Sequence, residues 1–190
     1  METHSQISNH TPNNEFSPGS SVVYAMHGKC NIISIEDRQV SGQSIRFYKL
    51  MVQKPTLSRT TRQDPAIWVP ISSAREQGMR SIMTQAEVDG ALKILSNREY
   101  YFSAAESFSA VQPKLEVTIR NEGGIGLAKT LSYLFVLKRK QIVPSPEVNK
   151  MYESVLRLLL REISEILGET SKALEEKINK GLRHKLIPDA

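Results

Sequence analysis

The first part of the chain alternates apolar and polar residues with the period of β-strands. Runs rich in Val, Ile, Tyr and Phe cover residues 20–26, 30–37, 44–52 and 67–71. Turn signals separate these runs, at Pro18-Gly19, His27-Gly28, Ser41-Gly42 and the polar stretch 54–65. Several short strands in such a short stretch are typical of a small antiparallel β-barrel.

From Thr84 onward the apolar residues recur with the period of helices. Thr84 and Glu87 have the spacing of a capping box, which predicts a helix start. Ser145 and Pro146 predict a second start, with Ser145 as the cap and Pro146 at the first helical position. Gly168 is expected to end that helix. Further helical patterns bring the expected number to about five, at residues 114–121, 126–140 and 169–183.

The change of period predicts an α+β chain with two domains. Residues 16–83 are expected to form the β domain, and residues 84–190 a compact all-α domain. Residues 1–15 are polar with one large aliphatic side chain, so they are expected to form a disordered tail.

Composition places the chain among globular proteins, with 39% hydrophobic and 24% charged residues. The net charge of +5 permits contact with nucleic acid without requiring it, because the basic residues are spread along the chain. No signal peptide or membrane-spanning run is visible, and a single cysteine fits a reducing compartment. A cytoplasmic protein that is monomeric in solution is therefore expected.

The only cysteine, Cys30, lies three residues after His27, which raises the question of catalysis. One interpretation is a nucleophile whose thiol pKa is lowered by Lys29. The other is that Cys30 opens a strand while His27 lies in the preceding turn, and the lack of an orienting third group favours it. The glycines of 123–126 lack the P-loop pattern and predict a loop before a helix. No catalytic residue, metal or cofactor is expected, since no histidine pair has metal-site spacing.

One ordered pattern in the β region is more specific. It runs Phe16-Ser-Pro-Gly19-Ser-Ser-Val-Val-Tyr24-Ala-Met-His27-Gly28 and continues with Ile35-Glu36. It goes on through Gly42, Phe47-Tyr48, Val69-Pro70 and Gly78-Met-Arg80. In this order the residues resemble the CarD family of transcription regulators, over residues 16–83 and more weakly into the helices. The first half is also similar to the polymerase-interacting module of transcription-repair coupling factor.

The resemblance implies a Tudor-like barrel that docks on the β subunit of bacterial RNA polymerase. It also implies a helical domain that contacts promoter DNA with little sequence preference, where an aromatic side chain wedges into the minor groove beside the transcription bubble. Such a wedge stabilises the open promoter complex, which fits a nucleoid-associated protein.

For the polymerase contact, the resemblance implies Arg38, together with Val40 and Gly42 in the same hairpin. Trp68 occupies a position where the family often has a second polymerase-contacting arginine. Two interpretations of Trp68 remain, an exposed interface anchor or a core tryptophan of the barrel.

For the DNA wedge, the position implied by the resemblance falls on Phe108. Pro113 disfavours a helix that begins near Ser107, so a later start is expected. Tyr100, Tyr101 and Phe102 then become rival wedges, and packing of all four aromatic side chains between the domains remains an alternative.

Basic residues complete the expected DNA contacts. Lys150 matches a basic position of the family, Lys114 is the next base after the wedge, and Lys138 and Arg139 are candidates by position. The last two also suit the C-terminus of a helix. The basic loop 54–65 has two interpretations as well, added contacts or a mobile hairpin tip. A different overall hypothesis is an adaptor whose helical domain docks another protein rather than DNA.

Overall fold

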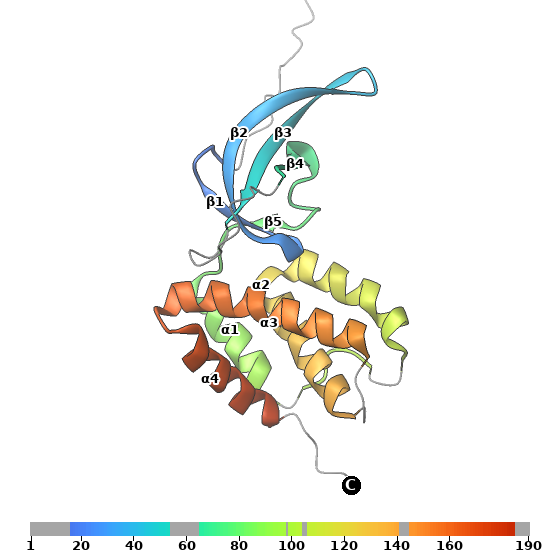
Figure 1. Ribbon diagram of the computed structural model, residues 1–190, viewed down its shortest axis with the longest axis vertical. Coiled ribbons are helices and arrows are strands. Elements are labelled where there is room, and N and C mark those ends of the chain that lie inside the picture. The colour runs from blue at the N-terminus through green and yellow to red at the C-terminus, as the bar shows by residue number, and fades with distance from the viewer. Residues whose placement is uncertain (1–15, 54–64, 98, 104–105, 141–144, 185–190) are drawn as a thin grey trace, which may run out of the picture.

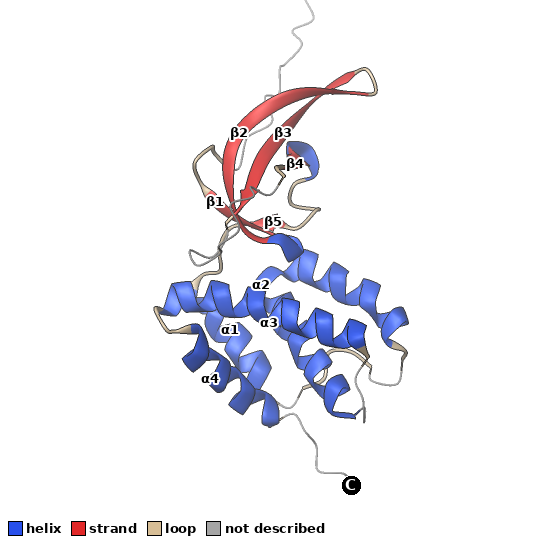
Figure 2. Ribbon diagram, viewed as in Figure 1, coloured by secondary structure: helices blue, strands red, loops and turns tan. Residues whose placement is uncertain are grey.

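A computed structural model describes most of the chain, namely residues 16–53, 65–97, 99–103, 106–140 and 145–184. The expected tail 1–15 and nearly all of the loop 54–65 lie outside the described residues. The strands lie on one side of the molecule and the α-helices on the other (Figures 1 and 2). The α+β class predicted from the sequence is therefore confirmed.

The strands form one antiparallel sheet in the order β4-β3-β2-β1-β5. Within the described residues no pairing joins β4 to β5, so the sheet is open and the expected closed barrel is not confirmed. The last strand was missed from the sequence, because two residues are too few to show an alternating pattern. The strands are β1 (Ser21–Tyr24), β2 (Gly28–Val40), β3 (Gln43–Val52), β4 (Ile67–Pro70) and β5 (Met79–Arg80).

One face of this sheet carries its own hydrophobic core. Full burial of a large apolar side chain such as Val, Ile, Leu or Met stabilises a fold by roughly 1.5–3 kcal/mol. Alternation along the strands supplies most of these side chains. The buried members are Val22, Cys30, Ile32, Tyr48, Leu50, Val69, Ala74 and Met79.

The β2–β3 hairpin extends beyond the other strands as a two-stranded arm (Figure 1). Pairing with β4 reaches only to Phe47, whereas β2 and β3 stay paired up to Val40 and Gln43. The turn between them consists of Ser41 and Gly42, whose φ angles are 51° and 82°. Positive φ at both positions is typical of the type I′ turn of tight hairpins, so the predicted turn is confirmed.

Four helices follow the sheet in the described part of the chain. They are α1 (Gln85–Ser96), α2 (Phe108–Lys140), α3 (Pro146–Leu167) and α4 (Ser171–Arg183). The Thr84–Glu87 capping box and the Ser145 cap are both present, and Gly168 ends α3 in the left-handed conformation. Among the described residues, no helix has the length and apolarity needed to span a membrane.

The helix α2 bends sharply at Gly123, where φ is 58°. The patterns 114–121 and 126–140, expected as separate helices, are two arms of this one bent helix, so a count of five is not confirmed. The glycines of 123–126, expected to form a loop before a helix, form the bend between the arms, and Gly126 lies close to the first arm. A Cβ there would clash with the backbone carbonyl of Thr118, so glycine permits this close approach.

The expected late start of α2 is also wrong. Amide groups of Ala110 and Val111 donate hydrogen bonds to the carbonyl of Ser107, and the helix continues through Pro113. Proline cannot donate to the carbonyl of Ser109, four residues earlier. Because Ser109 and Pro113 are both exposed, water can hydrate that carbonyl, and the helix tolerates the proline.

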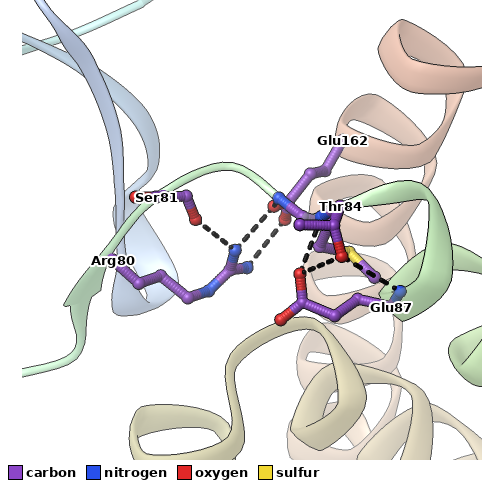
Figure 3. A network of polar contacts seen from close by, with 6 residues as sticks. Arg80, Ser81, Thr84, Glu87 and Glu162 are labelled. Carbon is purple, nitrogen blue, oxygen red and sulfur yellow. Dashed lines mark hydrogen bonds and ion pairs between the residues drawn. The ribbon is translucent and has the colours of Figure 1, made fainter.

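The sheet is fastened to α3 by a buried ion pair at its last strand (Figure 3). Arg80 donates two hydrogen bonds to the carboxylate of Glu162, at 2.6 and 2.7 Å. The same carboxylate accepts the backbone N–H of Met83 at 2.8 Å. A second ion pair joins Lys29 to Glu165, and Gly28 lies so close to α3 that a Cβ would stand 2.7 Å from Leu158. These contacts fix the position of the helices relative to the sheet.

Candidate functional site

The face of the sheet opposite its core carries a tryptophan flanked by two cations. Lys49 pairs with Ser34 on one side and with Trp68 on the other, so the three side chains share one face of β2, β3 and β4. The guanidinium carbon of Arg38 lies 3.8 Å from the centre of the Trp68 ring. The ammonium of Lys49 lies 5.1 Å from the same ring. Each contact is a cation–π interaction worth about 0.5–1 kcal/mol at an exposed site.

A carboxylate completes this group of side chains. Glu36 accepts hydrogen bonds from the Ser34 hydroxyl at 2.7 Å and from the Lys49 ammonium at 3.4 Å. The Ser34 hydrogen bond, followed by the attraction of Lys49 and Arg38, lowers the pKa of Glu36. The carboxylate is therefore ionised near neutral pH and keeps Lys49 beside the ring. We call Glu36, Arg38, Lys49 and Trp68 the Trp68 cluster.

All four residues expected to contact polymerase lie on this side of the sheet. Arg38 and Trp68 touch each other, while Val40 and Gly42 lie at the tip of the arm that carries Arg38. The Val40 side chain is 43% exposed. Trp68 is half-buried and lies outside the sheet's core cluster, so the interpretation as a core tryptophan does not hold.

An indole with a guanidinium on its face is suited to a protein interface. Tryptophan and arginine are enriched among the residues that contribute most to binding free energy. The ring offers flat apolar area, and the two cations favour a partner surface that bears carboxylates. Sequence reasoning missed Lys49 and Glu36, because only the strand register shows that they share a face with Trp68.

On the helical side, the side chain of Phe108, the expected wedge residue, packs against other residues and does not project into solvent. Phe108 is the first residue of α2, and it is half-buried against the helical core. Phe102 packs edge-to-face on Tyr133 with 5.5 Å between ring centres. The Tyr101 hydroxyl accepts a hydrogen bond from Asn97 and donates one to Glu99. Among the four candidates, only Tyr100 is strongly exposed, at 44%.

The four expected DNA-contacting cations do not gather at one place. Lys114 is exposed on the first arm of α2, where it forms an ion pair with Glu106 at 2.7 Å. Lys150 is exposed on α3. Lys138 and Arg139 lie at the end of the second arm of α2, where they line a cavity together with Arg183.

The Cys30 thiol has the opposite properties to an activated nucleophile. It is buried in the core of the sheet, and burial raises its pKa to about 11. Its Sγ lies 3.5 Å from the carbonyl oxygen of Gly28. His27 instead stacks on Tyr24, with 5.2 Å between ring centres and an interplanar angle of 6°. Cys30 therefore lies near the start of β2 as a core residue, and the interpretation as a nucleophile is wrong.

The part of the chain that the structure describes contains no group of three or more His, Cys, Asp or Glu side chains placed to hold a metal ion. The glycines of 123–126 belong to the bend of α2 and form no phosphate-binding loop. The Trp68 cluster is the strongest candidate for a binding surface among the described residues.

Comparison with known families agrees with this location. The family described as CarD-like/TRCF RID domain matches residues 16–83, which include all five strands and end directly before the α1 cap. Among curated proteins, no sequence matches the chain. Residues 16–83 are a CarD-like RNA polymerase-interacting domain, and the function of the chain is related to transcription.

Proposed function

We propose that the chain is a non-enzymatic transcription regulator that docks on the β subunit of bacterial RNA polymerase and stabilises the open promoter complex. The observation that carries this proposal is the Trp68 cluster, where Arg38 stacks on Trp68 on the outer face of the CarD-like domain. The bent sheet, with its single core, would be the counterpart of the Tudor-like barrel expected for the family. The expected location is the cytoplasm, at the nucleoid.

Polymerase docking is proposed to use the Trp68 cluster together with the arm that ends at Val40 and Gly42. Among the described residues no strand pairs with the arm beyond Phe47, and the side chains of Arg38 and Val40 are exposed on its outer face, where a partner can reach them. The stacked Arg38 loses little side-chain freedom on binding, because the indole already limits its orientations.

The helical domain is proposed to contact promoter DNA, through the phosphate backbone and an aromatic side chain. Lys114, Lys150, Lys138 and Arg139 would supply sequence-independent phosphate contacts. Tyr100 and Phe108 are the candidate wedges, Tyr100 for its exposure and Phe108 for its position in the resemblance. Because the Arg80–Glu162 pair fastens α3 to the sheet, docking on polymerase would hold the helices at a fixed place beside the DNA.

A pull-down of the polymerase β lobe by the full chain tests the docking step. The substitution Trp68→Ala is expected to abolish capture, because it removes the ring on which Arg38 and Lys49 rest. Arg46→Ala is the matched control, since Arg46 is a partly exposed residue of the same arm that pairs with Asp37 on the opposite face, away from the Trp68 cluster. Equal capture by the wild-type chain and the Trp68 variant would refute docking through this face.

An adaptor with a protein-binding helical domain is the second candidate function. The observation that favours it is the packing of Phe108 and Phe102 against the helical core, which leaves them little reach toward DNA. Fluorescence titration on a forked promoter fragment separates the two functions. The regulator is supported by salt-sensitive DNA binding that becomes weaker in Lys150→Ala and in Tyr100→Ala or Phe108→Ala. The exposed control Lys172→Ala should leave this binding unchanged. Absence of DNA binding by the wild-type chain supports the adaptor.

A further inference from the structure

A polar cavity lies at the end of the helical domain that points away from the sheet. Its lining residues come from the last turns of α2 and α4 and from the first turns of α3. The ends of α2 and α4 lie low in Figure 1. The volume of the cavity is about 320 Å³, at the lower end of the range of small-molecule sites. The lining residues are Phe135, Lys138, Arg139, Tyr152, Asn179 and Arg183.

The charge of this cavity is strongly positive. Among the described residues that line it, three side chains are cations and none is a carboxylate. The nearest ion-pair partner is Glu153, whose largely exposed carboxylate lies 3.9 Å from the Lys138 ammonium. Two helices end here, and each helix C-terminus carries a partial charge of about −0.5. The positive charge of the three cations is larger than the combined partial charge of the two helix ends, so stabilisation of those ends does not account for all three.

Aromatic rings hold two of the cations in place. The Lys138 ammonium lies 4.2 Å from the centre of the Tyr152 ring, and the Arg139 guanidinium carbon lies 5.6 Å from that of Phe135. Both rings are almost fully buried, so they form a rigid floor. Burial, assisted by Glu153 and Glu175, raises the pKa of Tyr152 to about 12, so its hydroxyl stays neutral and adds no negative charge.

We propose that this cavity binds phosphate groups. Guanidinium groups present paired N–H donors that match phosphate oxygens, and an ammonium adds a further point charge. The Asn179 amide supplies a neutral donor beside them. The phosphate belongs either to a nucleoside polyphosphate or to the DNA backbone, and the second source rests on the proposed function.

Isothermal titration of the full chain with sodium tripolyphosphate at low ionic strength tests this site. Binding is expected, and Arg183→Gln should weaken it about tenfold through loss of one charge-assisted contact. Lys180→Gln is the matched control, because Lys180 is an exposed residue of the same helical turn that does not line the cavity. Protection of Cys30 from alkylation verifies that each variant is folded. Absence of binding, or equal weakening by both substitutions, overturns the proposal.

Competition experiments identify the source of the phosphate. Displacement of tripolyphosphate by GTP but not by a forked promoter duplex supports the site and assigns it to a nucleotide. Displacement by the duplex, with Arg183→Gln weakening duplex binding as well, supports the site and assigns it to the DNA backbone. A third outcome is that the chain binds tripolyphosphate through Arg183 but binds no DNA. That result supports the phosphate site and refutes the proposed DNA contact.

Discussion

Removal of Arg80 from the junction between sheet and helices should destabilise the whole chain. In Arg80→Met, the carboxylate of Glu162 loses a two-pronged partner and keeps only the Met83 N–H. The Glu162 side chain is 7% exposed, so water cannot replace the lost guanidinium easily. The perturbation therefore leaves an uncompensated charge at a nearly buried site.

The magnitude follows from the exposure of the two partners. Breaking one side of a fully buried ion pair costs roughly 3–5 kcal/mol. Solvent screens part of this pair, because the Arg80 side chain is 22% exposed. We therefore expect a loss of about 2–4 kcal/mol in the free energy of unfolding. For a chain of this length, that loss lowers Tm by roughly 5–15 °C.

The double variant Arg80→Met/Glu162→Leu separates charge from packing. It leaves no unpaired carboxylate, and its main cost is the lost acceptor of the Met83 N–H, about 1–2 kcal/mol. It should therefore be more stable than Arg80→Met alone. Arg157→Met makes a similar exchange at an exposed position of α3 and should change stability by less than about 0.5 kcal/mol.

Urea unfolding of the full-length variants, followed by circular dichroism, measures these differences. An Arg80→Met loss below about 1 kcal/mol would refute the importance of the pair. A double variant as unstable as Arg80→Met, or less stable, would show that the unpaired charge is not the cause.

Three further predictions follow from the described residues. Native Cys30 should resist alkylation near pH 8 and react at once after unfolding, because burial raises its pKa to about 11. The folded chain holds this proton more tightly than the unfolded chain, so the free energy of unfolding should fall as pH rises from about 9 to about 11. Rapid alkylation of the folded chain would contradict the buried position. Gly126→Ala should lower the free energy of unfolding in urea by about 2–3 kcal/mol, because the new Cβ meets the Thr118 backbone. Gly181→Ala makes only ordinary contacts and should be neutral or stabilise α4. Equal effects of the two substitutions would argue against a close approach of the α2 arms. Thr84→Ala should cost about 1 kcal/mol by removal of the α1 capping box, and an unchanged unfolding midpoint would show that the cap is dispensable.

Local signals in the sequence predicted the features that local interactions determine. The Thr84 and Ser145 caps, the Gly168 helix end and the Ser41-Gly42 turn each depend on a few neighbouring residues. The strand alternation likewise predicted four of the five strands. Backbone conformations of this kind are set by side chains within a turn or two, so a single sequence reveals them.

Features that depend on distant contacts were not predictable in the same way. The bend of α2 at Gly123 packs against the side chain of Arg80. A Cβ on Gly123 would lie only 2.6 Å from the Cδ and Nε atoms of Arg80. The ion pair of Arg80 with Glu162 joins residues 82 positions apart. Sequence periodicity carries no information about such pairs.

The candidate sites show the same division. Family resemblance led to the prediction that Arg38 and Trp68 contact polymerase. It did not predict that the guanidinium rests on the ring, because the two residues come from different strands. Lys138 and Arg139 were candidates by position alone. Their association with Arg183 depends on where α2 and α4 end in space, which the sequence pattern does not give.

Titration of the isolated polymerase β lobe with the full chain tests the central claim most directly. Wild-type chain should bind, Trp68→Ala should bind at least tenfold more weakly, and Arg46→Ala should match the wild type. The double variant Arg38→Ala/Trp68→Ala should lose less than the sum of the single losses, because the two side chains act through one stacked contact. Unchanged affinity in Trp68→Ala, in a variant that still protects Cys30, would contradict docking through the Trp68 cluster.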